Sequence, residues 1–288
     1  MNYRHAYHAG NFADVVKHAV LALVIGHMKL KPAPFRIIDT HAGIGLYDLE
    51  AEEAHKTGEW REGIGRLRAA KVSPEAEALL APYLDVVRRL NPDGALTRYP
   101  GSPLIAREMM RAEDRLVVNE LHPEDRQALR RLFGHDPQVK VMELDAWTAV
   151  KALLPPPERR GLVLIDPAFE QPGELDRLVA ALKEGVRRFA GGTYLLWYPI
   201  KEARAVAAFR RNIAALGMNK AMALELMIRG PEDEQRLNGA GIIAVNAPFT
   251  LATNMRVLLP ELAAVLAQGK GGGFRLDELG AEALKGAR

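Results

Sequence analysis

The stretch Leu162-Val163-Leu164-Ile165-Asp166-Pro167-Ala168-Phe169-Glu170 carries the clearest fold signal in the chain. Its four bulky apolar residues predict a strand buried on both faces, which is typical of a parallel sheet covered by helices. Pro167 lacks an N–H and keeps Asp166 extended, so the strand should end there. Open α/β sheets bind ligands at the carboxyl ends of their strands. We therefore expect Asp166, Pro167 and Phe169 to lie at a ligand-binding edge.

These three residues suit methyl transfer to an amino group attached to an aromatic ring. Such a nitrogen is a poor nucleophile because its lone pair is delocalised into the ring. The Asp166 carboxylate and the Pro167 carbonyl could accept its two N–H bonds, and Phe169 could stack on the ring. The alternative interpretation is an ordinary strand end at which Asp166 caps the next helix. Asp-Pro is common after an apolar run, so at this point both interpretations stay open.

The chain contains no cysteine, and this excludes several kinds of chemistry. Disulfides, thiolate zinc sites, iron–sulfur clusters and cysteine nucleophiles all require that residue. Methylation of a pyrimidine carbon through a cysteine adduct is excluded for the same reason. The rest of the composition, 48% hydrophobic and 26% charged among 288 residues, is that of a soluble globular protein.

Charge and hydropathy predict a cytoplasmic protein with a weak preference for a polyanionic partner. The formal net charge is +3 and the sequence pI is about 9.1. The polar residues 1–5 do not resemble a signal peptide. No apolar run approaches the roughly 18 residues that span a bilayer, so we expect no membrane partner.

Acidic residues follow four predicted strands: Asp39, Glu120, Asp145 and Asp166. The first strand, 35–39, runs into Thr40-His41-Ala42-Gly43-Ile44-Gly45, whose glycines let the backbone approach a ligand closely. This is not the dinucleotide fingerprint, because Asp48 stands where the third glycine would be. Glu120 could accept both hydroxyls of a ribose, and Asp145 an adenine amino group. Together they predict a pocket for an adenosine-containing cation, and S-adenosylmethionine fits that description.

Near the amino terminus, apolar residues at helical spacing predict a helix over residues 12–30. Asp14 and His18 share an edge of this helix one turn apart. A lone histidine there is more often a satisfied core residue than a ligand. Lys17 and His18 nevertheless belong to a polar cluster near the amino terminus, which makes a binding role worth keeping.

The rest of the chain alternates between strands and helices, with one interruption. Residues 50–98 contain no β-branched run and a predicted helix over 74–90, so we expect a helical insertion. Residues 99–103 should then return the chain to the sheet. Residues 269–288 open with Gly-Lys-Gly-Gly-Gly and predict a flexible join to a short terminal helix or tail. Three further strands are expected over 193–198, 221–228 and 241–245.

Seven motifs together resemble the bacterial large-subunit ribosomal RNA adenine-N6 methyltransferases of the RlmJ type, and they span most of the chain. They are Tyr3-Arg4-His5-x-x-His8-Ala9-Gly10-Asn11, Asp14-Val15-x-Lys17-His18, Asp39-Thr40-His41-Ala42-Gly43, Tyr99-Pro100-Gly101-Ser102-Pro103, Glu120-Leu121-His122-Pro123, Asp166-Pro167 and Leu196-Trp197-Tyr198-Pro199. As a set they are far more specific than Asp-Pro or Gly-x-Gly alone.

The resemblance implies an α/β, Rossmann-like class I S-adenosylmethionine-dependent methyltransferase with a small inserted helical subdomain. Residues 1–49 would form the amino-terminal arm, a helix and the first βα unit, 50–98 the insertion, and 99–288 the remainder with a C-terminal tail. The implied reaction is N6 methylation of one adenine of 23S ribosomal RNA, position 2030 in reference numbering. The implied substrate is naked or incompletely assembled RNA, and we expect a monomer without a metal ion.

The resemblance also implies roles for individual residues. Asp166 is the expected catalytic residue. The expected cofactor-binding residues are Lys17, His18, Asp39, His41, Gly43, Ser102, Glu120, Asp145, Ala146 and Asp166. The expected substrate-binding residues are Tyr3, Arg4, Pro167 and Phe169, with Tyr3 as an RNA contact in a mobile amino-terminal arm.

Two positions depart from the family pattern. The family's usual motif is Asp-Pro-Pro-aromatic, and Ala168 replaces the second proline here. The carbonyl needed for the amine belongs to Pro167, so the acceptor is kept while rigidity is lost, worth roughly 0.4–1 kcal/mol. We therefore expect a looser but active site. Ala146 stands where the family commonly has glycine, a change that should be tolerable beside an adenine.

Three rival hypotheses remain open at the level of sequence. The first is an amino methyltransferase of the same fold that acts on DNA, on protein glutamine or on a small amine. The second is a non-catalytic RNA-binding assembly factor. The third is a metal-dependent hydrolase, disfavoured because its ligands would be scattered over an arm, a helix and a loop: His5, His8, His18, His41 and Asp39.

Overall fold

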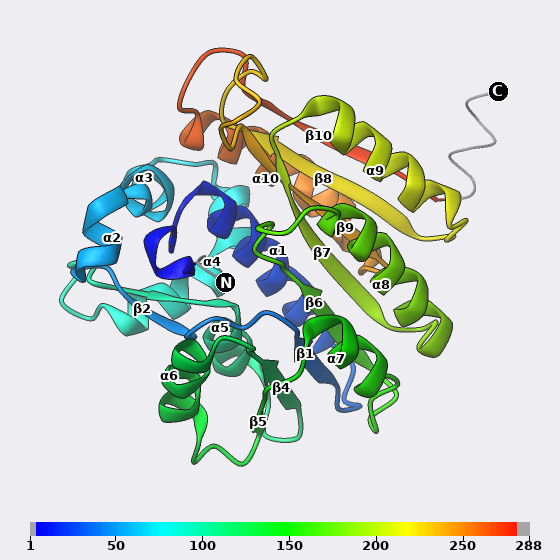
Figure 1. Cartoon of the computed structure of the whole chain (residues 1–288). Coiled ribbons are helices and arrows are strands. Elements are labelled where there is room, and N and C mark those ends of the chain that lie inside the picture. The colour runs from blue at the N-terminus through cyan, green and yellow to red at the C-terminus, as the bar shows by residue number, and fades with distance from the viewer. Residues whose placement is uncertain (1–3, 281–288) are drawn as a thin grey trace.

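The structure, a computed structural model, describes residues 4–280 and contains an eight-stranded sheet between two layers of helices (Figure 1). The strands occur in the order β10-β8-β9-β7-β6-β1-β4-β5. Their bounds are β1 (Arg36–Asp39), β4 (Arg115–Asn119), β5 (Val139–Met142), β6 (Gly161–Ile165), β7 (Thr193–Ile200), β8 (Ala221–Met227), β9 (Gly239–Val245) and β10 (Gly273–Glu278). The five strands from β5 to β7 pair in parallel, whereas β9 pairs antiparallel with both neighbours and β10 antiparallel with β8. The α/β, Rossmann-like prediction is confirmed.

The central strand β6 is buried on both faces, as its sequence predicts. Leu162 and Leu164 belong to the core under α1 (Phe12–Met28), α5 (Ser102–Met109) and α10 (Phe249–Leu266). Val163 and Ile165 belong to the core on the other face, under the helices α7 (Ala146–Ala152), α8 (Glu174–Arg188) and α9 (Ala203–Ala215). Each such side chain stabilises the fold by about 1.5–3 kcal/mol relative to exposure. The alternation therefore fixes which strand residues face each layer.

The amino-terminal helix begins where its sequence places a cap. The Asn11 side chain accepts hydrogen bonds from the amides of Ala13 and Asp14, both at 3.0 Å. This satisfies two donors that the first turn cannot satisfy by itself. A short 3-10 turn, η1 (His5–Tyr7), precedes the cap. The predicted helix over residues 12–30 is confirmed and ends two residues earlier.

Residues between β1 and β4 form a helical segment, as expected. It contains α2 (Glu52–Thr57), the π-helical turn η2 (Arg61–Gly65), α3 (Arg66–Ala69) and α4 (Pro74–Leu90). Figure 1 shows α2 beside the amino-terminal arm. The helices share one core with α1 and α10, and the division into 1–49, 50–98 and 99–288 stays a prediction.

One expectation about the end of this segment is wrong. Residues Arg98–Pro100 form β3, which pairs antiparallel with β2 (Leu46–Asp48) in a separate two-stranded sheet and does not join the central one. The chain therefore returns to the core through α5. That helix begins after Gly101, and Pro103 occupies its first turn.

The terminal helix or tail expected after the glycine-rich join is also wrong for residues 273–278. They form β10, which pairs with β8 so that Phe274 lies opposite Leu226 and Leu276 opposite Leu224. The glycines before it had favoured a flexible segment, but a free strand edge on β8 provides the pairing partner. Residues 281–288, where a terminal helix or tail was expected, lie outside the described residues.

Helix α10 was not predicted at all. It is the one helix among residues 4–280 long and apolar enough to cross a membrane, with a mean hydropathy of 1.3. Its leucines and Met255 are buried where the helix packs against α1, α4 and the sheet strands β8 and β10, so one face of the helix is part of the core. Thr250, Asn254 and Arg256 interrupt the apolar sequence, and this concealed the helical period. Composition alone therefore gives weak support for a membrane span.

Candidate active site

A cavity of about 1060 Å³ lies at the carboxyl ends of the parallel strands. The predicted residues that line it are Lys17, His18, His41, Gly43, Ser102, Glu120, Asp145, Ala146, Asp166, Pro167 and Phe169. Asp39 and Arg4 do not line it, and Tyr3 lies outside the described residues. Because β6, β1, β4 and β5 are neighbours, their four terminal acids come together at one edge. The structure thus gathers most of the predicted site.

Glu120 is held by backbone on two sides. One carboxylate oxygen accepts the Gly43 amide and the other the His122 amide, each at 2.8 Å. Gly43 has a φ of +60°, and a Cβ there would lie 2.4 Å from the Tyr47 hydroxyl oxygen. Burial raises the pKa of Glu120 despite these two donors. Each oxygen keeps a further lone pair for a ligand hydroxyl.

Asp39 lies behind the cavity wall. Its carboxylate accepts the Ser102 hydroxyl at 2.7 Å and the His41 amide at 3.3 Å. Burial raises the pKa of Asp39 to about 6, although both donors oppose that shift. The carboxylate therefore orients two residues that do line the cavity, rather than facing it directly.

Asp145 caps helix α7, because its side chain accepts the Thr148 amide at 3.0 Å. Ala146, the first helical residue, is buried against the same part of the cavity.

His41 lies edge-on to Trp147 at 5.8 Å between ring centres. Burial lowers the pKa of His41 to about 4, so its ring is neutral near pH 7.

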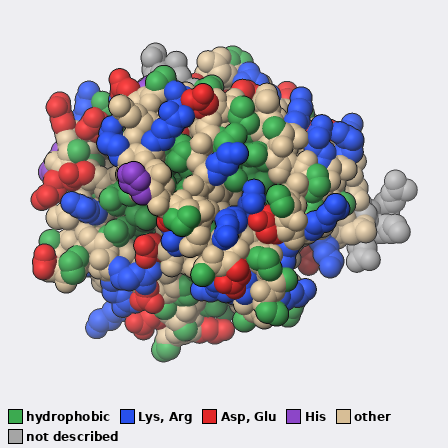
Figure 2. Space-filling view, turned by 90° about the horizontal axis from the view of Figure 1, so that it is seen from below, with side chains coloured by type: hydrophobic (Ala, Val, Ile, Leu, Met, Phe, Trp, Pro, Cys, Tyr) green, Lys and Arg blue, Asp and Glu red, His purple; other side chains and the backbone are tan. Residues whose placement is uncertain are grey.

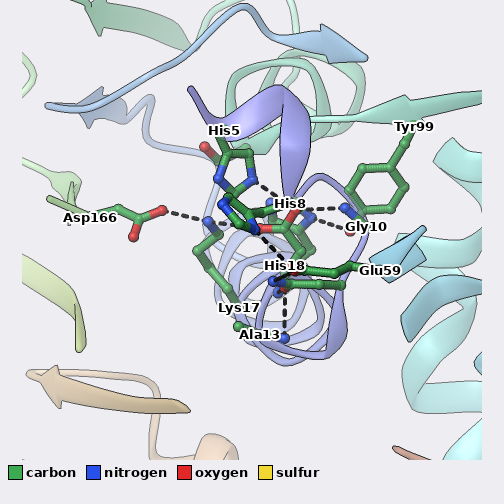
Figure 3. A network of polar contacts seen from close by, with 12 residues as sticks. His5, His8, Gly10, Ala13, Lys17, His18, Glu59, Tyr99 and Asp166 are labelled. Carbon is green, nitrogen blue, oxygen red and sulfur yellow. Dashed lines mark hydrogen bonds and ion pairs between the residues drawn. The ribbon is translucent and has the colours of Figure 1, made fainter. Parts of the chain in front are cut away.

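A chain of charges leads from the amino-terminal arm to Asp166 (Figure 3). The Lys17 amine forms ion pairs with Asp166 and, at 3.0 Å, with Asp14. Asp14 is buried and also accepts His5 Nε2 at 2.9 Å and the Gly10 amide at 2.8 Å. Burial alone would lower the pKa of Lys17, but the two carboxylates outweigh it and raise the pKa well above its usual value. Lys17 is therefore a cation that offsets the charge of Asp166.

Two acceptors beside this ion pair belong to residues that line the cavity and have no donor in the described part of the chain. Among residues 4–280, neither Asp166 Oδ1 nor the Pro167 carbonyl oxygen has a hydrogen-bond donor. Phe169 follows at a φ of +55°, a strained backbone conformation for an aromatic residue and one that occurs mainly at functional sites. Its ring lies edge-on to Trp197 at 5.5 Å between ring centres. The site thus offers two acceptors next to an aromatic corner.

His18 is a buried histidine with one ring nitrogen that has no hydrogen-bond partner in the described part of the chain. Its Nδ1 lies 2.7 Å from the Tyr99 hydroxyl, which lies 2.9 Å from the Tyr83 hydroxyl. Burial lowers the pKa of His18 to about 3, so the ring is neutral. Its Nε2 is buried without a partner among the described residues, although the side chain lines the cavity. The Nδ1 side of His18 therefore fits a satisfied core histidine, whereas the Nε2 side leaves a binding role possible at the cavity.

The amino-terminal arm is docked on both neighbouring elements. Arg4 forms ion pairs with Glu124 at 2.6 Å and Asp125 at 2.9 Å, at the start of helix α6 (Pro123–Phe133). Glu59 accepts from the Asn11 side chain at 3.0 Å and lies 2.9 Å from His8 Nδ1. Sequence reasoning missed Glu59, because its two partners lie about 50 residues away and no local motif marks it.

The five side chains that a metal-dependent hydrolase would have needed do not form one ligand set. His5, His8 and His18 are engaged by Asp14, Glu59 and Tyr99 respectively. Within the described part of the chain, no group of three or more His, Cys, Asp or Glu side chains is arranged to hold a metal ion. The geometry gives that hypothesis no support.

Comparison with known proteins identifies the family. Residues 32–278 match the family model described as ribosomal RNA large subunit methyltransferase D, RlmJ. The chain belongs to the RlmJ family of methyltransferases. It is 43% identical to ribosomal RNA large subunit methyltransferase J of Haemophilus influenzae over 267 residues, 92% of this chain and 94% of that protein. It is 42% identical to the protein of the same name from Escherichia coli, over 91% of this chain and 92% of that protein.

The chain is also similar to a solved structure of a Legionella pneumophila protein. It superposes with a TM-score of 0.85 at 31% identity and covers 94% of this chain and 98% of that chain. The family model and the two relatives confirm the predicted family, and the mostly parallel sheet between helices agrees with the class I methyltransferase fold.

Proposed function

We propose that this RlmJ-family chain transfers a methyl group from S-adenosylmethionine to the N6 amine of one adenine in 23S ribosomal RNA. The observation that carries the proposal is the pair of open acceptors, Asp166 Oδ1 and the Pro167 carbonyl oxygen, at the cavity edge. An exocyclic amine has two N–H bonds, and this pair matches them. The names of the relatives supply the substrate class, ribosomal RNA of the large subunit.

The cavity fits the proposed cofactor. Its volume of about 1060 Å³ exceeds the range typical for one small ligand, which leaves room for a cofactor and a base. Glu120 would hold the ribose hydroxyls, the Asp145–Ala146 step the adenine, and the open His18 Nε2 a polar group of the methionine part. When bound, S-adenosylmethionine supplies an electrophilic sulfonium methyl group.

The residues of the chain orient the acceptor. The target adenine leaves its stack at a cost of a few kcal/mol, less if it is already unpaired. Phe169 stacks on the ring, while Asp166 and Pro167 accept the two N–H bonds and favour a more pyramidal nitrogen. Positioning supplies most of the rate because the transfer is direct and has no covalent intermediate. The amine then gives up one proton, either to Asp166 or to water.

The biological setting follows the family. The chain would act in the cytoplasm as a monomer on naked or incompletely assembled RNA, at the adenine numbered 2030 in the reference. Arg4 and Tyr3 would contact the RNA from the arm, which requires Arg4 to exchange its ion pairs with Glu124 and Asp125 for phosphate.

The test is methyl transfer from labelled S-adenosylmethionine to large-subunit ribosomal RNA, both naked and in assembled subunits, followed by nucleoside digestion. We expect the label as N6-methyladenosine and only from naked RNA. Label in a different nucleoside would contradict the adenine-N6 claim. Cofactor binding without any RNA labelling would move the acceptor to DNA, protein or a small amine, and absence of cofactor binding would overturn the proposal.

A further inference from the structure

Three basic side chains line the cavity on the side opposite the strand-end acids. They are Lys201 after β7, Arg229 after β8 and Arg236 in the loop that leads to β9, and we call them the basic wall. None forms an ion pair with a carboxylate among residues 4–280. Arginines elsewhere are commonly paired, as Arg107 is with Asp136 and Arg111 with Asp114.

The strand order separates the basic wall from the predicted cofactor side. Strands β5, β4 and β1 carry the acids and the glycine turn, and β6 carries Asp166. Strands β7, β9 and β8 lie beyond β6 in the sheet. Asp166 therefore lies between the cofactor side and the basic wall, and a substrate that reaches Asp166 from the β7 side passes the three cations.

The local contacts leave these cations available. Arg229 donates only to the Gln268 side-chain oxygen at 2.8 Å, and its Nε is buried without a partner among the described residues. Lys201 and Arg236 are exposed. The positive charge of Lys201 also acts to lower the pKa of His8, so these two residues of the cavity lining lie near each other.

Acidic side chains near the cavity decide which cations belong to the basic wall. Arg177 lines the same cavity, but it acts electrostatically on Glu174, which lies alongside, so its charge is partly offset. Glu232, Asp233 and Glu234 share the loop of Arg236 but do not line the cavity. On the face seen in Figure 2, basic and acidic side chains are interspersed, so a net charge of +3 does not by itself define an RNA surface.

We propose that the basic wall binds the phosphate backbone of a single-stranded RNA segment that flanks the target base. The inference rests on the proposed RNA substrate and adds the direction from which that RNA reaches Asp166. Unpaired Lys and Arg side chains bind phosphates and release counterions, so affinity falls with salt. For single strands each contact contributes a slope of about 0.7 in the dependence of log affinity on log salt concentration.

The experiment measures RNA affinity at several salt concentrations for the double variant Lys201→Gln/Arg236→Gln and for the triple variant that adds Arg229→Gln. The expected loss of slope is about 1.4 for the double and about 2 for the triple variant. The control is Arg256→Gln on α10, an exposed arginine without an ion pair in the described chain and away from the cavity. The affinity for S-adenosylhomocysteine should be unchanged in all of them.

An unchanged slope in the double variant, or an equal loss in Arg256→Gln, would overturn the basic wall. The double variant keeps the test valid if Arg229→Gln alters folding through the lost Gln268 contact, because both of its residues are exposed. Failure of the unmodified chain to methylate any RNA would instead contradict the proposed function. The two failures are therefore distinguishable.

Discussion

The strand-end side and the arm side of the cavity are built from different kinds of contact. The strand-end side, which contains Glu120 and Asp145, is held by amides close in sequence or on an adjacent strand end. The arm side, residues 5–18, is held by the helical segment far along the chain. Its contacts run from Asn11 and His8 to Glu59.

Another of these long-range contacts joins two backbones. The Gly10 carbonyl accepts the Ile64 amide at 2.9 Å, beside Gly63. Gly63 departs from helical geometry inside η2, and a Cβ there would lie 2.1 Å from the Gly10 carbonyl oxygen. Only glycine allows this approach, since real Cβ contacts under 3.0 Å are essentially never seen. Changes in the insertion should therefore reach Asp166 through the arm.

The largest expected effect is at the residue that both sides share. Asp166→Ala removes one amine acceptor and the partner of Lys17, so methylation should fall by a factor on the order of a thousand. Affinity for S-adenosylhomocysteine should persist, because the strand-end side remains intact. Isothermal titration alongside labelled methyl transfer checks this. Loss of both properties would show that Asp166 serves cofactor binding or folding instead.

A smaller but still large effect is expected for Gly63→Ala. The added methyl group would force the arm backbone away, at a cost of about 1–3 kcal/mol, so RNA methylation should fall about 5- to 150-fold. Gly65→Ala is the matched control, because its Cβ would lie 3.2 Å from the Trp60 carbonyl oxygen in a helical conformation. S-adenosylhomocysteine affinity should be nearly unchanged in both. Equal activity of the two variants would refute the backbone contact.

Ala168→Pro should have an effect of a few fold in the opposite direction. Within residues 4–280 the Ala168 amide donates no hydrogen bond, so a proline there removes none. The gain in rigidity is about 0.4–1 kcal/mol, which predicts a two- to fivefold gain in turnover or RNA affinity. Steady-state methylation kinetics measure both. Unchanged values would show that rigidity at this position does not limit the reaction.

The smallest expected effect is a pH dependence of arm docking. The hydrogen bond to Glu59 raises the pKa of His8. Burial alone would raise the pKa of Glu59, but the hydrogen bonds from His8 and Asn11 outweigh it and lower that pKa. Protonated His8 stabilises docking fully below pH 6.5, the ordinary pKa of histidine. This contribution is lost as the pH rises through the raised pKa of His8. Ionised Glu59 stabilises docking fully above pH 4.5, the ordinary pKa of glutamate. This contribution is lost as the pH falls through the lowered pKa of Glu59.

Docking should therefore be strongest between about pH 4.5 and 6.5. Because both side chains are more than a third exposed, solvent weakens the effect. Proteolysis of the arm at several pH values would measure it. Cleavage of the arm should rise above pH 6.5 in the unmodified protein, and this rise should disappear in Glu59→Gln. A rise that persists in the variant would show that another group causes the pH dependence.

Sequence motifs predict the strand-end side well, because its contacts are local or join the ends of neighbouring strands. Asp145 and Thr148 are three residues apart, and the four acids follow strands whose apolar residues reveal them. The paired charges of Asp166 and Lys17 are 149 residues apart, and only packing of α1 against the sheet brings them together. Strand β10 was missed because its partner β8 lies about 50 residues earlier. Helix α10 was missed because polar residues conceal its period.

The most direct test of the two-sided site is hydrogen–deuterium exchange of the intact protein, with S-adenosylhomocysteine and then with RNA added. We expect S-adenosylhomocysteine alone to protect residues 39–45, 119–122 and 145–148, and RNA to add protection to residues 5–12, 201–203 and 228–237. Protection of residues 5–12 or 228–237 by S-adenosylhomocysteine alone, with none at the strand ends, would contradict the assignment of the cofactor to the strand-end side.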